Sequence, residues 1–229
     1  MAGIPIPYTM RADNIITLIL LLCFIISGGA MANSGLFVVR QAKALAREPK
    51  EGTTVVSETG AEVRFQLYLV VQTALLFAII IYYFAIEAQG DKMLSPAYEF
   101  VGACFLLIFL MTGMRALFYT GVNNLFFDAK RNMQFLRSLL FVTAMEGVAM
   151  YPAVLLLVYF DIDSQGIVFY IGFVLVLVKM ITIYKCWTIF FGRRGDFLQI
   201  FLYFCTLEIV PLSILAGLLA LTGNYLTVN

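Results

Sequence analysis

The sequence contains no histidine, and only 13% of its 229 residues are charged. Without histidine the chain lacks the commonest metal ligand, the usual axial ligand of haem and the usual proton shuttle. A typical soluble domain has about 25% charged residues, so the deficit argues against a soluble fold. The formal net charge of +1 argues against a nucleic-acid partner. We therefore expect no metal, no cofactor and no nucleic acid.

Short catalytic and ligand-binding motifs are missing as well. The chain has no P-loop, no GxGxxG, HExxH or GxSxG motif and no aspartate-rich metal motif. The four cysteines lie in apolar stretches without CxxC spacing, which is typical of small buried hydrophobic residues and not of a disulfide framework. These absences lean against an enzyme.

What the chain does have is apolar surface, with 62% hydrophobic residues and a mean hydropathy of +0.94. A bilayer-spanning helix needs roughly 20 mainly apolar residues, and six stretches qualify. The sequence predicts an all-α polytopic membrane protein with six transmembrane helices in one bundle over residues 1–229. The spans lie near 14–32, 65–86, 97–122, 135–160, 166–191 and 197–222.

The first stretch has a second interpretation. The triplet Ala30-Met31-Ala32 after an apolar run resembles the cleavage site of a signal peptide. The strong positive charge follows this run instead of preceding it, which favours a retained span. Both interpretations remain open from the sequence alone.

Lysine and arginine are distributed unevenly between alternate connections, which predicts orientation by the positive-inside rule. The connections after the first, third and fifth spans are rich in lysine and arginine, whereas Lys92 is the only basic residue in the connections after the second and fourth spans. The basic connections should face the cytoplasm and both termini the periplasm. The basic residues are Arg40, Lys43, Arg47, Lys50 and Arg64, then Lys130, Arg131 and Arg137, then Lys185, Arg193 and Arg194.

The connection 36–64 is the longest polar piece. Apolar and basic residues alternate over 36–48 at helical spacing, which predicts a short amphipathic helix on the cytoplasmic membrane surface that ends at Pro49. The stretch 53–65 reads as a short extended hairpin that turns near Thr59-Gly60. The connection is too short for a catalytic domain. Its alternative role is a docking site for a protein partner.

Four ionisable residues interrupt the predicted spans: Arg115, Glu146, Lys179 and Glu208. Because a charge at the bilayer centre costs about 2.5 kcal/mol or more, such residues usually face the bundle interior and pair. At 1.5 Å per residue, the last three lie roughly 15 Å from the cytoplasmic ends of their spans, near the midplane. Arg115 lies nearer the cytoplasmic end and can reach the interface. We take the four as a candidate intramembrane charge cluster.

A proline follows each glutamate, at Pro152 and Pro211. Proline inside a helix frees the carbonyl one turn earlier and kinks the axis. Each glutamate therefore sits close to a free carbonyl, an arrangement that suits ion or proton handling. It suits a static hydrogen-bonded cluster that fixes helix packing equally well.

Polar residues also gather in the connection after the third span and in the basic turn after the fifth. We take them as candidate cytoplasmic surface contacts, mainly in a solvated loop that touches lipid headgroups. They are Asn123, Asn124, Asp128, Lys130 and Arg131, with Arg193 and Arg194 in the second turn.

Two segments carry a family resemblance: KCWTIFFGRRGDFLQIFLYFCTLEIVPL (185–212) and LFYTGVNNLFFDAKRNMQFLRS (117–138), the latter followed by Gly147, Pro152 and Tyr159. They resemble an uncharacterised six-span inner-membrane protein family of Bacteroidota with an LEIxP signature near the C-terminus. The resemblance runs from about residue 65 to the end. The family's usual base in the third span is lysine, and Arg115 departs from it while keeping the charge. The resemblance implies a bacterial inner membrane and supplies no reaction.

Three functional hypotheses remain open. The first is a non-catalytic accessory or scaffold component of an envelope complex. The second is a proton- or ion-coupled transporter or channel that uses Glu146, Glu208 and Lys179, which at 229 residues calls for a homo-oligomer. The third is a lipid-modifying membrane enzyme. The expected partners are the lipid bilayer, a second copy of the chain, or a protein that docks on 36–64.

Overall fold

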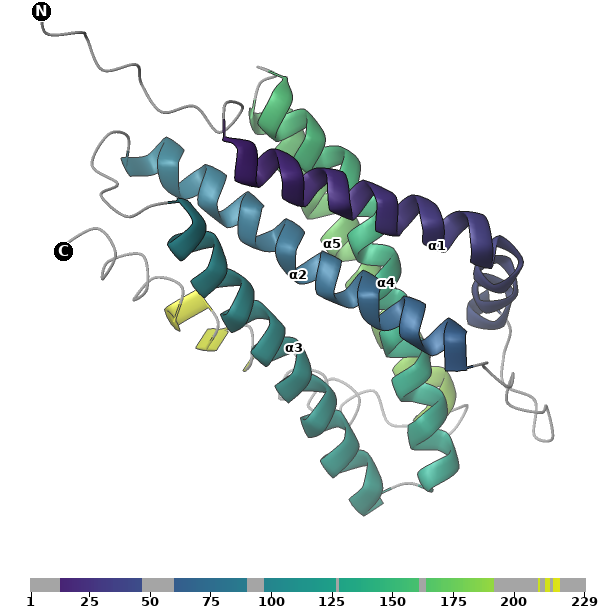
Figure 1. The fold of residues 1–229 in the computed structure, drawn as a ribbon. Helices are drawn as coiled ribbons and strands as arrows, with labels where there is room; N and C mark the ends of the chain where they lie inside the picture. Colours follow the sequence, from purple (N-terminus) through teal and green to yellow (C-terminus); the bar gives the residue numbers. More distant parts are fainter. Residues whose placement is uncertain are drawn as a thin grey trace, which may run out of the picture.

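The computed structural model describes residues 13–46, 60–89, 97–126, 128–160 and 164–191, together with 210, 213, 214 and 216–218. Five long α-helices account for nearly all of this part of the chain (Figure 1). They are α1 (Asn14–Ala46), α2 (Gly60–Gln89), α3 (Ala97–Phe126), α4 (Ala129–Tyr159) and α5 (Ser164–Cys186). A five-residue π-helix, η3 (Trp187–Phe191), continues α5.

Successive helices run in opposite directions, and α2 and α4 form the centre of the bundle (Figure 1). α1 and α3 pack against α2, and α5 packs against α4. The main core draws buried residues from all five helices, for example Leu20, Ile79, Cys104, Val154 and Ile171. Two smaller clusters lie outside this core among the described residues, one around Phe135 and Cys186 and one around Leu69 and Ala144.

Four of the described helices are long and apolar enough to cross a bilayer: Glu62–Glu87, Tyr98–Asn124, Ala129–Tyr159 and Ser164–Phe190. A shorter apolar helix covers Asn14–Gly29. The protein is therefore an all-helical membrane protein. The predicted count of six spans stays a prediction, since the sixth, 197–222, lies almost wholly outside the described residues.

The predicted separate surface helix after the first span is wrong, because α1 is one helix from Asn14 to Ala46. After Gly35 no glycine or proline occurs before Pro49, so nothing in the sequence stops the helix. Figure 1 shows the last turns of α1 running in a different direction from its first part. The predicted hairpin is wrong over 60–65, where α2 has already begun with Glu62 in its first turn.

The predicted polar loop between the third and fourth spans is also helical. α3 extends to Phe126 and α4 begins at Ala129, with Asp128 in the N-cap position. Asn123 and Asn124 therefore belong to α3, and Lys130 and Arg131 belong to α4. Helix-forming residues flank this tight turn, and polarity alone does not stop a helix. Lys185, expected in the next basic connection, lies inside α5 and is buried.

Candidate functional site

The two central helices approach each other closely at Gly147 of α4. A Cβ atom added there would overlap Thr73 Oγ1 and lie 3.1 Å from Thr73 Cβ and 3.2 Å from Thr73 Cα. The Thr73 hydroxyl donates to Leu69 O within its own helix (2.8 Å) and contacts Thr143 O across the interface (3.1 Å). A glycine at this position lets the backbones touch, as small residues do at membrane helix interfaces.

Glu146, beside this crossing, is a carboxylic side chain that is only 8% exposed within a predicted span. Leu139 and Phe135 lie 7 and 11 residues before Glu146, so their side chains leave α4 on the same face as that of Glu146. We call this row of side chains the stripe of Glu146. Phe135 packs against Phe190 of η3, with ring centroids 5.2 Å apart. The stripe of Glu146 therefore faces α5 and its π-helical extension.

Lys179 lies on the matching stripe of α5, seven residues before Cys186, which packs in the same cluster as Phe135. Glu146 is 11 residues beyond Phe135, and Lys179 is 11 residues before Phe190. Since α4 and α5 run in opposite directions, this register brings the two side chains to about the same height along the bundle. Neither Glu146 nor Lys179 is without an interaction partner.

Arg115, the third described member of the predicted charge cluster, lies against an aromatic group near the α3–α4 turn. Its Cζ atom is 5.8 Å from the centroid of the Tyr119 ring, within the range of a cation–π contact. Tyr119 packs on Phe135 at 5.0 Å. The chain Arg115–Tyr119–Phe135–Phe190 thus joins α3, α4 and η3.

The structure describes five of the seven predicted surface contacts, and these five differ in burial. Asn123 is completely buried, and its amide donates to Asn132 Oδ1 (3.2 Å), while Asn132 donates to Asn124 Oδ1 (2.8 Å). This asparagine network braces the α3–α4 turn, so Asn123 is not at the surface. Asn124, Asp128, Lys130 and Arg131 are exposed, as surface contacts must be. Arg193 and Arg194 lie outside the described residues.

Pro152 lies inside α4, which continues to Tyr159. Proline cannot donate to the carbonyl of Val148, one turn earlier. The next carbonyl, of Ala149, accepts a hydrogen bond from Tyr170 Oη of α5 at 2.8 Å. α5 therefore contacts α4 by a polar bond close to the proline. Glu208 and Pro211 lie outside the described residues, so their proposed place beside Glu146 and Lys179 stays a prediction.

Sequence reasoning missed two buried glutamines of α2. Gln72 (1% exposed) donates from Nε2 to Ser27 Oγ of α1 at 2.6 Å, whereas its Oε1 is buried without a hydrogen-bond partner. Gln66 (2% exposed) has no hydrogen bond at either amide atom within the described structure. The available signal was two amides within an apolar run of a predicted span, where polar groups mark interior faces.

The described residues contain no group of three or more histidine, cysteine, aspartate or glutamate side chains that could hold a metal ion. The fold and its buried polar groups define the class: a membrane protein of long apolar helices with ionisable residues in its interior.

A comparison with family models then places the chain within that class. Residues 16–219 match the model of a domain of unknown function, DUF4271, and the chain belongs to this family. No curated protein and no solved structure matches it.

Proposed function

We propose that this chain is a non-catalytic accessory or scaffold component of an envelope complex in the bacterial inner membrane. The observation that supports the proposal is the packing of Phe135 of α4 on Phe190 of η3, since Glu146 and Lys179 each lie 11 residues from these rings and this register predicts a common height for the two charges. A permanently paired acid and base inside a bundle fixes which helices pack and in which register. Such a pair needs no substrate.

The energetics favour a permanent pair. Each unpaired charge near the bilayer centre costs about 2.5–3.5 kcal/mol on insertion scales, so two helices with opposite charges gain by inserting together. Removing one partner leaves the other buried and uncompensated, which is more damaging than removing both. A stability cycle can therefore identify a structural pair.

The test compares Glu146→Gln, Lys179→Gln and the double variant in lipid nanodiscs by thermal melting. A structural pair predicts that each single substitution lowers the melting temperature and that the double variant loses less than the sum of the two. Lys130→Gln, at an exposed position near the start of α4, is the control and should melt like the wild type. Strict additivity would reject the pair. Single variants that melt normally but lose a cellular phenotype would reject the static role.

A second function, a proton- or ion-coupled transporter built around Glu146, Glu208 and Lys179, is favoured by one observation. Pro152 lies six residues after Glu146, so the Val148 carbonyl lacks its usual donor near a buried carboxyl group. Proton flux in liposomes tests it. Flux that depends on Glu146 would support transport, and flux equal to that of empty vesicles would reject it. A pull-down of the intact chain from membranes tests the accessory role, which requires a stoichiometric partner.

A further inference from the structure

Two basic side chains, Arg115 of α3 and Lys185 of α5, lie in the interior and play no part in the functions proposed above. Lys185 is only 5% exposed, and the Nε and Nη2 atoms of Arg115 are buried. Both residues also interact with other parts of the protein. They lie inside the candidate spans Tyr98–Asn124 and Ser164–Phe190, so both charges are withdrawn from water.

The packing of η3 against α3 predicts a common height for these two bases. Tyr119 of α3 lies in one buried cluster with Ile189 of η3 and Leu139 of α4. Arg115 lies four residues before Tyr119, and Lys185 lies four residues before Ile189, so each base is about one turn from the cluster. Because α3 and α5 run in the same direction, both turns lead the same way along the bundle (Figure 1).

Positive charge is in excess at this height. Glu146 is the one buried carboxylate among the described residues. It lies seven residues beyond Leu139 on α4, or about 10 Å further along the helix at 1.5 Å per residue. Glu146 is therefore closer in height to Lys179 than to Arg115 and Lys185.

The other carboxylates do not reverse this excess. Glu62 in the first turn of α2 and Asp128 at the start of α4 lie at this end of the described bundle, and neither is buried. If Glu208 joins the interior as predicted, three bases still meet two acids. Two like charges repel each other more strongly inside a protein than in water, so an anion between them stabilises the folded state.

We propose that Arg115 and Lys185 together bind one phosphate group. A planar guanidinium donates two parallel hydrogen bonds to phosphate oxygens, and an ammonium supplies a compact positive charge. The Cζ atom of Arg115 lies 5.8 Å from the centroid of the Tyr119 ring, a contact that holds the guanidinium beside the cluster. Two sources supply this chemistry, the headgroup of a phospholipid and free inorganic phosphate.

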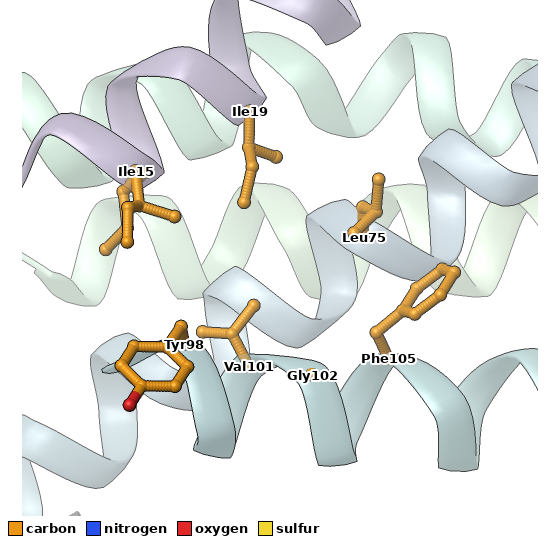
Figure 2. A pocket seen from close by; sticks show the side chains of 8 residues that line it. Ile15, Ile19, Leu75, Tyr98, Val101, Gly102 and Phe105 are labelled. Atoms are coloured by element: carbon orange, nitrogen blue, oxygen red, sulfur yellow. The ribbon is translucent and has the colours of Figure 1, made fainter. Parts of the chain in front are cut away.

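The apolar groove between α1 and α3 does not offer the same chemistry. It has a volume of about 120 Å³ and lies near the starts of both helices, whereas Arg115 and Lys185 lie in the later parts of helices that run the same way. Figure 2 shows Ile15 and Ile19 of α1 opposite Tyr98 and Phe105 of α3. No basic side chain lines this groove, so it has no group that attracts an anion.

Native mass spectrometry of the full chain, purified from membranes in a phosphate-free detergent, tests the site and identifies the source. We expect one adduct per chain with the mass either of phosphate or of one phospholipid. Arg115→Gln with Lys185→Gln should reduce this adduct by roughly tenfold or more, because both charge-assisted contacts are lost. Lys130→Gln with Arg131→Gln removes two exposed charges at the same end and is the matched control, which should retain the adduct.

A melting assay keeps the proposal testable if the interior double variant does not fold. The delipidated chain is melted with inorganic phosphate against chloride at equal ionic strength, and with phosphatidylglycerol against diacylglycerol, which has similar tails and no phosphate. The true source should raise the melting temperature of the wild type by about 3 °C or more at ten times its dissociation constant. Arg115→Lys keeps the charge without the paired hydrogen bonds and should show a smaller rise.

Three results would overturn the proposal. The first is a wild-type chain that carries neither adduct and melts at the same temperature with every probe. The second is an exposed-charge control that loses the adduct to the same extent as the interior double variant. The third is a rise in melting temperature that is as large in Arg115→Lys and in a folded interior double variant as in the wild type.

Discussion

Gly147→Ala should separate the two central helices. The new methyl group would lie 3.1–3.2 Å from Thr73 Cβ and Cα, closer than the 3.5–4.0 Å of a comfortable carbon contact. Thr73 cannot rotate away without losing its hydroxyl contacts to Leu69 O and Thr143 O, and its Cα cannot move without its helix. Overpacking of this kind costs about 1–3 kcal/mol, against a gain of up to about 1 kcal/mol in helix propensity.

Because the added Cβ atom also overlaps Thr73 Oγ1, the upper part of the cost range, about 2–3 kcal/mol, applies, and the net loss is about 1–2 kcal/mol. At roughly 2–4 °C per kcal/mol for a chain of this size, the melting temperature should fall by about 2–8 °C. Thermal melting in nanodiscs measures it, with Gly172→Ala in α5 as the control, because a Cβ atom there meets no neighbouring atom. Thr73→Ala combined with Gly147→Ala should be less damaging than the sum of the single changes. If Gly147→Ala melts at or above the wild-type temperature, the close crossing of α2 and α4 is refuted.

Two further predictions concern buried polar groups, and a third concerns the topology. Asn132→Ala breaks both hydrogen bonds of the asparagine network and should lower the free energy of unfolding by about 1–3 kcal/mol in a melting assay. Lys130→Ala, at an exposed position, is the control and should leave the melting temperature nearly unchanged. Equal effects of the two substitutions would contradict the network. Gln66→Leu should raise the stability of the folded chain by about 1 kcal/mol or more, because it removes a buried amide that has no hydrogen bonds. Gln72→Leu should lower that stability, because the Gln72 amide donates to Ser27 of α1. The opposite order of the two stabilities would mean that Gln66 has a hydrogen-bond partner. A cysteine at Asn229 should react with an impermeant thiol reagent from the periplasmic side, and labelling only from the cytoplasm would refute the predicted topology.

Much of the architecture was predictable. Runs of apolar residues long enough to span a bilayer identify α2 to α5 directly, and the described helices agree with four of the predicted spans to within a few residues, except that α4 begins six residues early. The errors fall at the polar ends. The predicted boundaries followed hydropathy, whereas a helix continues into polar sequence until a breaker or a cap stops it.

The candidate site was predictable only in part. Glu146 and Lys179 stand out in the sequence because charge within an apolar run is costly. Gln66, Gln72 and Lys185 were missed or misplaced. An uncharged amide costs less in lipid than a full charge, so it marks an interior face less sharply, and a lysine near the end of a span looks like part of a basic connection. Their burial depends on which helix packs over them, and local sequence does not encode that neighbour.

Composition and periodicity by themselves determined that this chain is an all-helical membrane protein with costly charges inside its spans. That follows from solvation, because a residue's transfer cost into lipid depends on the residue alone. Which helices touch was decided only by the tertiary structure. The Gly147–Thr73 crossing, the common height of Glu146 and Lys179, and the groove between α1 and α3 each join segments far apart in the chain. In lipid, the choice of neighbours is made by close packing and by polar groups that need partners, and both are properties of pairs of helices.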